Sequence, residues 1–162
     1  MHKVLCIDDG YSIFSQSFLD IMKENGIDCK WQNWSEATGE AKDTDGKIDF
    51  KRLSKNLRLD SYDLLLIDLM MPPNGILGTF NGFLTGINLH IELCEASPSI
   101  KALNNTFFIT NLPRNEKPDS YYAIAEDYAK SVSGHLFRKN NLKDIVDKII
   151  AELNKKRNEI EA

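Results

Sequence analysis

The sequence lacks the features that mark several classes of protein. Its three cysteines, Cys6, Cys29 and Cys94, lie far apart in apolar surroundings and form no CxxC pair. We therefore expect small buried side chains rather than a disulfide framework or a zinc site. No stretch reaches the roughly 20 apolar residues of a membrane span, and the amino terminus carries no signal-peptide pattern. These absences favour a cytoplasmic protein with no membrane insertion.

Charge of one sign is not concentrated anywhere in the chain. The 20 basic and 24 acidic residues give a net charge of −4, and the longest basic cluster, residues 155–157, lies in a mixed-charge tail. Nucleic-acid binding therefore has no electrostatic basis. The length of 162 residues and the apolar fraction of 42% are those of a single globular domain, which we expect to cover residues 1–162.

Short apolar runs alternate with amphipathic segments along the chain. The runs that resemble strands are residues 4–7, 27–31, 64–67, 106–110 and 135–137. Helical spacing follows each of them, near Phe14, Asp49, Ile87, Tyr122 and Leu142. The second of these helices is expected over residues 49–59, with Asp49 as its N-cap. This alternation predicts a flavodoxin-like (βα)5 three-layer α/β sandwich with a five-stranded parallel sheet. Two polar or Gly/Pro-rich segments, residues 35–48 and 73–85, are expected to be extended loops.

Polar side chains follow the predicted strands at their carboxyl ends. Asp8 and Asp9 follow the first strand, Asp68 ends the third and Thr110 ends the fourth. Sites in open parallel sheets form at this edge. Carboxylates that converge repel one another unless a cation neutralises them, and Mg²⁺ binds carboxylates together with phosphate oxygens. A carboxylate beside such a metal can attack phosphorus, so the pattern predicts a phosphoryl-transfer site.

The same residues resemble the receiver domain of two-component response regulators, over nearly the whole chain. Residues 4–9 read VLCIDD and resemble the first strand of the family with its acidic pair. Residues 62–72 read YDLLLIDLMMP and resemble the phosphoacceptor motif, which is the most specific stretch. Residues 107–110 read FFIT and resemble the fourth strand, which ends in the Ser or Thr that contacts the phosphoryl group.

The resemblance implies a role for each site residue. Asp68 would accept the phosphoryl group, and Thr110 would contact it. Mg²⁺ would be bound by Asp9, Asp68 and the backbone carbonyl of Met70, with Asp8 acting through a water molecule. Such a domain is not a conventional enzyme and at most catalyses its own phosphorylation and dephosphorylation.

The implied partners are a histidine kinase or phosphotransfer protein and an unknown downstream protein, and a homodimer is one alternative for the oligomeric state. A second function remains open, a receiver-like protein-interaction scaffold that is not phosphorylated. A Mg²⁺-dependent phosphohydrolase with Asp8 as nucleophile fits less well, because that class has Asp-x-Asp where this chain has Asp8-Asp9-Gly10.

Three positions depart from the pattern of the family. Thr85-Gly86 stands where an Asp-Gly usually opens the third helix, and Asn111 replaces a small residue beside the site. The family has a lysine at the end of its fifth strand, and in this chain that position corresponds to Arg138 or to Lys139, depending on the register. Both side chains cannot project the same way from a regular strand. We favour Lys139, because a compact ammonium reaches a phosphoryl oxygen more readily than a planar guanidinium.

Overall fold

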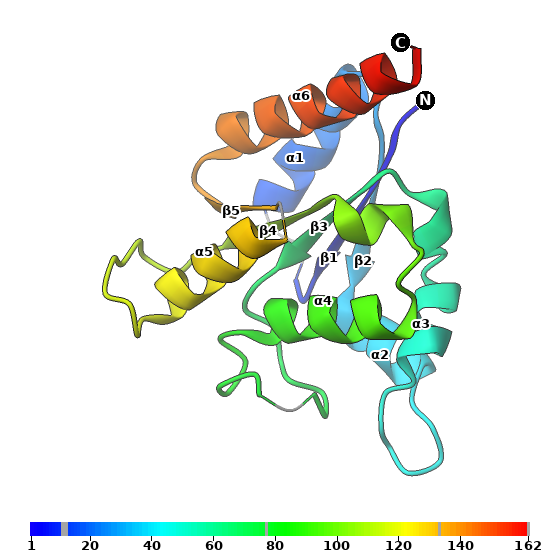
Figure 1. Cartoon of the computed structure of the whole chain (residues 1–162), viewed down its shortest axis with the longest axis vertical. Helices are drawn as coiled ribbons and strands as arrows, with labels where there is room; N and C mark the ends of the chain where they lie inside the picture. The colour runs from blue at the N-terminus through cyan, green and yellow to red at the C-terminus, as the bar shows by residue number, and fades with distance from the viewer. Residues whose placement is uncertain (11–12, 77, 133, 162) are drawn as a thin grey trace.

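The chain forms a five-stranded parallel sheet with helices on both faces (Figure 1). The computed structural model describes residues 1–10, 13–76, 78–132 and 134–161. The strands lie in the order β2-β1-β3-β4-β5, so the first and third strands of the chain are neighbours. Their bounds are β1 Lys3–Asp8, β2 Asp28–Asn33, β3 Leu64–Asp68, β4 Thr106–Thr110 and β5 His135–Arg138. The predicted flavodoxin-like α/β fold is confirmed.

Six helices are described, and they divide between the two faces of the sheet. α1 and α6 cover one face, and α2 to α5 cover the other (Figure 1). Their bounds are α1 Ile13–Glu24, α2 Trp34–Glu40, α3 Phe50–Asn56, α4 Thr85–Ala96, α5 Tyr121–Ser131 and α6 Leu142–Glu161. Two 3-10 turns, Leu59–Ser61 and Lys101–Asn104, precede β3 and β4. Among the described residues, no helix is long and apolar enough to span a membrane.

Alternating side chains of the central strands form two separate cores. In β1, Leu5 and Ile7 pack into the core on the α2–α5 face, whereas Val4 and Cys6 pack into the core under α1 and α6. The side chains of β3 are buried along its whole length. Burial on both faces explains why these strands appear in the sequence as continuous apolar runs.

The expectation of a loop over residues 35–48 is wrong in its first part, because α2 occupies Trp34–Glu40. The side chain of Asn33 caps this helix by accepting a hydrogen bond from the Glu36 N–H at 3.0 Å. Trp34 is fully buried, and its Nε1–H donates to the Pro72 carbonyl at 2.7 Å. One capping side chain and one buried indole thus hold a short helix whose remaining surface is largely polar.

The second predicted helix is present but shorter than expected. Asp49 caps it as predicted, with Oδ1 accepting from the Arg52 N–H at 3.1 Å. The helix ends at Asn56, and Arg58 then takes a left-handed conformation with φ of 53°. This residue turns the chain into the 3-10 segment before β3, where a longer helix was expected.

In the described part of residues 73–84 the chain forms an irregular loop whose two ends lie side by side, and Thr85, expected in this loop, is instead the first residue of α4. Gly82 accepts a hydrogen bond from the Met71 N–H at 3.2 Å, and the Thr85 hydroxyl donates to the Met71 carbonyl at 2.6 Å. Phe83 stacks on Tyr121 of α5, with ring centroids 4.7 Å apart. The loop is therefore anchored both to the segment after β3 and to α5.

The first turn of α4 lies directly against the end of β3. The N–H of Gly86 donates to the Leu69 carbonyl at 3.0 Å, and a Cβ atom at position 86 would lie 2.4 Å from the Asp68 carbonyl oxygen. Only glycine allows this approach of two backbones. Residue 86 therefore fixes the height of α4 above the candidate site.

We expect Gly86→Ala to lower the free energy of unfolding by about 2 kcal/mol, because the backbone of β3 or α4 must shift to admit the methyl group. Gly39→Ala is the matched control, since Gly39 also lies in a helix but a Cβ there meets nothing within 4 Å. The control should raise stability by ~0.5–1 kcal/mol through reduced chain entropy. Urea denaturation measures both, and equal effects of the two substitutions would contradict the packing argument.

Candidate functional site

Three carboxylates meet at the carboxyl edge of the sheet. Asp8 ends β1, Asp9 follows it, and Asp68 ends the neighbouring strand β3. One carboxylate oxygen from each lies within 4.8 Å of the other two. Asp8 and Asp68 are buried, with 3% exposure each, while Asp9 is exposed. The structure thus brings together the three acids that the sequence pattern singled out.

The Asp8 carboxylate is held by the loop that follows it. Its Oδ1 accepts hydrogen bonds from the backbone N–H groups of Asp9 at 2.7 Å and Gly10 at 3.3 Å. The loop is fixed in turn by the Trp31 indole, which donates to the Gly10 carbonyl at 3.0 Å. The second oxygen, Oδ2, instead accepts from Lys139 Nζ at 3.0 Å.

A lysine from the far side of the sheet reaches this cluster. Lys139 Nζ lies 3.0 Å from Asp8 Oδ2 and 3.4 Å from Asp68 Oδ2. The Lys139 N–H also donates to the Thr110 carbonyl at 2.9 Å, which continues the pairing of β4 with β5 by one residue. Arg138 instead donates from Nε to the Leu112 carbonyl at 3.1 Å. Lys139, which we favoured from the sequence for the position of the family's lysine, thus lies at the acidic cluster. Its role in phosphoryl transfer stays a prediction.

Thr110 and Met70 complete the surroundings of the cluster. Thr110 is fully buried at the end of β4, and its Oγ1 accepts from the Leu112 N–H at 3.0 Å. Met70 lies two residues after Asp68 and, with Asp9 and the loop 81–83, lines a groove of about 310 Å³. Asn111, which stands where the family has a small residue, is exposed.

The proximity of the acids shifts their protonation equilibria. Burial and the charge of Asp8 raise the pKa of Asp68 to about 9. Burial also acts to raise the pKa of Asp8, but a hydrogen bond from Asp68 and the charge of Lys139 outweigh it and lower that pKa. Without a metal, Asp8 and Asp68 therefore share one proton near neutral pH. Burial alone would lower the pKa of Lys139, and the two carboxylates raise it instead.

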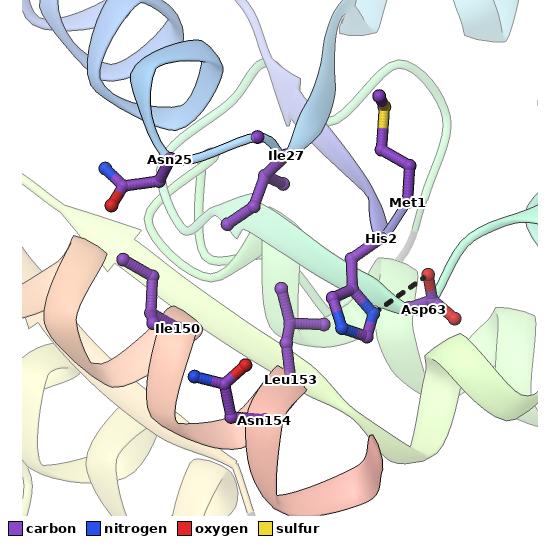
Figure 2. A pocket seen from close by; sticks show the side chains of 9 residues that line it. Met1, His2, Asn25, Ile27, Asp63, Ile150, Leu153 and Asn154 are labelled. Carbon is purple, nitrogen blue, oxygen red and sulfur yellow. Dashed lines mark ion pairs between the residues drawn. The ribbon is translucent and has the colours of Figure 1, made fainter.

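A second cavity lies at the opposite edge of the sheet, around the start of β1 (Figure 2). Its volume is about 590 Å³, and its apolar wall includes Ile27 and Leu153. Across it His2 Nδ1 lies 3.8 Å from Asp63 Oδ2, and that oxygen also accepts from the Lys3 N–H at 2.8 Å. This cavity is larger than the groove beside Asp9 but contains none of the residues predicted for the site.

Two features of the site could not be predicted from the sequence. One is the contact of Arg138 with Leu112, which joins β5 to the loop after β4. The other is the groove wall formed by Asn81, Gly82 and Phe83. The length of the loop that contains this wall was visible in the sequence, but the direction in which the loop folds was not.

Comparison with known proteins supports the fold. No protein-family model matches the sequence, and no curated protein matches it. A Francisella receiver domain, response regulator 1452, is 20% identical with a TM-score of 0.59, covering 96% of this chain and 99% of that one. An N-terminal receiver domain from Methanoculleus marisnigri is 13% identical with a TM-score of 0.51, covering 92% and 94%.

A third similar structure is the chemotaxis response regulator CheY4 of Vibrio cholerae. It is 14% identical with a TM-score of 0.50, and the match covers 92% of this chain and 98% of that one. All three structures are similar to this chain over nearly its whole length, and the chain therefore has the fold of response regulator receiver domains. The resemblance seen in the sequence is thus confirmed at the level of the fold.

The raised pKa of Asp68 predicts how replacing its carboxyl group changes the stability of the fold. The folded-state pKa of about 9 exceeds the unfolded value of ~3.9, so unfolding at pH 7 releases a proton. Stability from this group is therefore complete below about pH 4 and is lost as the pH rises toward 9. Asp68→Asn should raise the free energy of unfolding of the metal-free protein at pH 7 by about 2 kcal/mol.

Glu95→Gln, at an exposed carboxyl of α4, is the control and should change stability by less than ~0.5 kcal/mol. Denaturant unfolding in the presence of a chelator at pH 4, 7 and 9 measures both variants. The gain for Asp68→Asn should grow with pH. A loss of stability in Asp68→Asn at pH 7 would contradict the raised pKa of Asp68 and the burial and Asp8 charge to which it is assigned.

Proposed function

We propose that the chain is a phosphoacceptor receiver domain that is phosphorylated on Asp68 in a Mg²⁺-dependent reaction. The observation that carries this proposal is the convergence of Asp8, Asp9 and Asp68 with the Lys139 ammonium at the carboxyl edge of the sheet. The receiver-domain fold adds independent support, because this edge is where open α/β sheets bind ligands.

The chemistry of the donor set fits Mg²⁺. Every candidate ligand is a hard oxygen donor, and the three carboxylates carry more negative charge than a single ammonium neutralises. Asp9, Asp68 and the Met70 carbonyl would hold the ion, with Asp8 acting through water. When bound, Mg²⁺ would offset the repulsion among the carboxylates and the negative charge on the phosphoryl oxygens.

The proposed reaction transfers a phosphoryl group to the ionised Asp68 carboxylate. One oxygen of Asp68 attacks phosphorus, and an O–P bond forms as the bond from phosphorus to the donor atom breaks. The donor keeps the electron pair of the broken bond, and an imidazole donor then takes a proton from solvent. The product is an acyl phosphate, and later attack by water releases inorganic phosphate.

Lys139 and Thr110 would stabilise the transferred group. The Lys139 ammonium already touches Asp68 Oδ2, so a small displacement brings it to a phosphoryl oxygen. Thr110 uses its oxygen to accept from Leu112 and retains its hydroxyl proton for donation. Both groups are held by the β4–β5 pairing, so the protein supplies two donors in fixed positions.

The proposed partners follow from this reaction. The phosphoryl donor would be a histidine kinase or a phosphotransfer protein, and a downstream protein would recognise the phosphorylated form. The resemblance to two-component receivers also supports a cytoplasmic location.

Incubation with acetyl phosphate and Mg²⁺ should add the mass of one phosphoryl group to the intact protein. Asp68→Asn should abolish the gain, because the amide is not a nucleophile, and chelation of Mg²⁺ should lower the rate by at least ~100-fold. Asp60→Asn, at an exposed carboxyl before β3, is the control and should be phosphorylated at the wild-type rate. If wild-type protein gains no mass from acetyl phosphate, phosphoramidate or phosphorylated kinases, the proposed function is wrong.

A further inference from the structure

We propose that Arg138 is a positioning residue that sets the location of the Thr110 hydroxyl. It would act through Leu112, whose N–H binds Thr110 and whose carbonyl binds Arg138. This inference rests on the proposed phosphorylation of Asp68. It extends the site to a side chain that touches neither the phosphoryl group nor the metal.

The Thr110 hydroxyl belongs to a tight turn at the end of β4. Its Oγ1 accepts from the Leu112 N–H at 3.0 Å, two residues along the chain. Such a turn selects the side-chain rotamer and occupies one lone pair of the oxygen. The O–H proton stays free to donate, and its direction depends on where the Leu112 backbone lies.

The loop that carries Leu112 is long and exposed. It runs from Asn111 to the start of α5 at Tyr121, and residues 113–119 lie in contact with solvent. The other hydrogen bonds described for this loop are local and join residues within 115–124. Leu112 is half-buried and packs against the core on the α2–α5 face, so this residue attaches the loop to the sheet.

Arg138 fixes this attachment from the adjacent strand. Its Cα pairs with that of Thr110 across the β4–β5 ladder, and its Nε–H donates to the Leu112 carbonyl at 3.1 Å. The guanidinium is always charged, so the bond is charge-assisted. The next residue, Lys139, extends to Asp8 and Asp68. Two consecutive residues therefore serve the two donors of the site. Lys139 supplies the ammonium itself, and Arg138 positions the Thr110 hydroxyl through Leu112.

Three substitutions separate the hydrogen bond from charge and packing. Arg138→Met removes the N–H donor and keeps an unbranched stem of similar length. Arg138→Gln keeps an N–H donor at the same number of bonds from the backbone as Nε, without the charge. Thr110→Val removes the hydroxyl and keeps the branched shape that suits a strand.

The first measurement is the rate of Asp68 phosphorylation by acetyl phosphate at saturating Mg²⁺. Arg138→Met should slow it by about tenfold, because a donor displaced by a fraction of an ångström stabilises the transferring group less well. Arg138→Gln should recover most of that rate. In a Thr110→Val background, Arg138→Met should cause no further loss, since the hydroxyl that it positions is gone. The Mg²⁺ dissociation constant should be the same in Arg138→Met as in wild type.

The second measurement needs no phosphorylation. Hydrogen exchange at the Leu112 amide should be faster in Arg138→Met than in wild type, and near the wild-type rate in Arg138→Gln. Three results would overturn the role of Arg138 and leave the proposed function intact. They are unchanged exchange at the Leu112 amide in Arg138→Met, equal phosphorylation rates in Arg138→Met and Arg138→Gln, and additive effects of Arg138→Met and Thr110→Val on the phosphorylation rate. A wild-type protein that takes no phosphoryl group would overturn the proposed function, and the positioning role with it.

Discussion

The repulsion between buried carboxylates is the constraint on which the rest of this site depends. Asp8 and Asp68 end neighbouring parallel strands, so the sheet itself forces them together. Two anions this close cannot both remain charged away from water unless a cation faces them. Lys139, reaching back from the end of β5, meets that need in part. Burial first, and then the charge of Asp8, still raise the pKa of Asp68 despite this ammonium.

The order of the strands brings further polar side chains to the same edge of the sheet as the carboxylates. The order β2-β1-β3-β4-β5 places the acids on β1 and β3, the hydroxyl on β4 and the ammonium after β5, all at one edge. α4 approaches that edge closely because Gly86 has no side chain to collide with the Asp68 carbonyl. The loops that follow β3 and β4 are each hydrogen-bonded back to the segment that they leave.

Much of this could be predicted from the sequence, because the signals are local. Each buried strand is a short apolar run, and the acids stand directly after two of them, so the rule for strand ends places Asp8 and Asp68 together. α2 was missed because its signal is one capping Asn33 and one buried Trp34 in a polar stretch. The Arg138–Leu112 bond joins residues 26 positions apart, and no pattern in the chain marks such a contact.

Under the proposed function, Mg²⁺ would displace a proton held by the pair of Asp8 and Asp68. Titration calorimetry of Mg²⁺ into metal-free protein at pH 7, in buffers of different ionisation enthalpy, measures the protons released per ion bound. With the Asp68 pKa at about 9, we expect close to one proton per Mg²⁺, falling toward zero in Asp68→Asn. Magnesium binding without proton release in the wild-type protein would contradict the account.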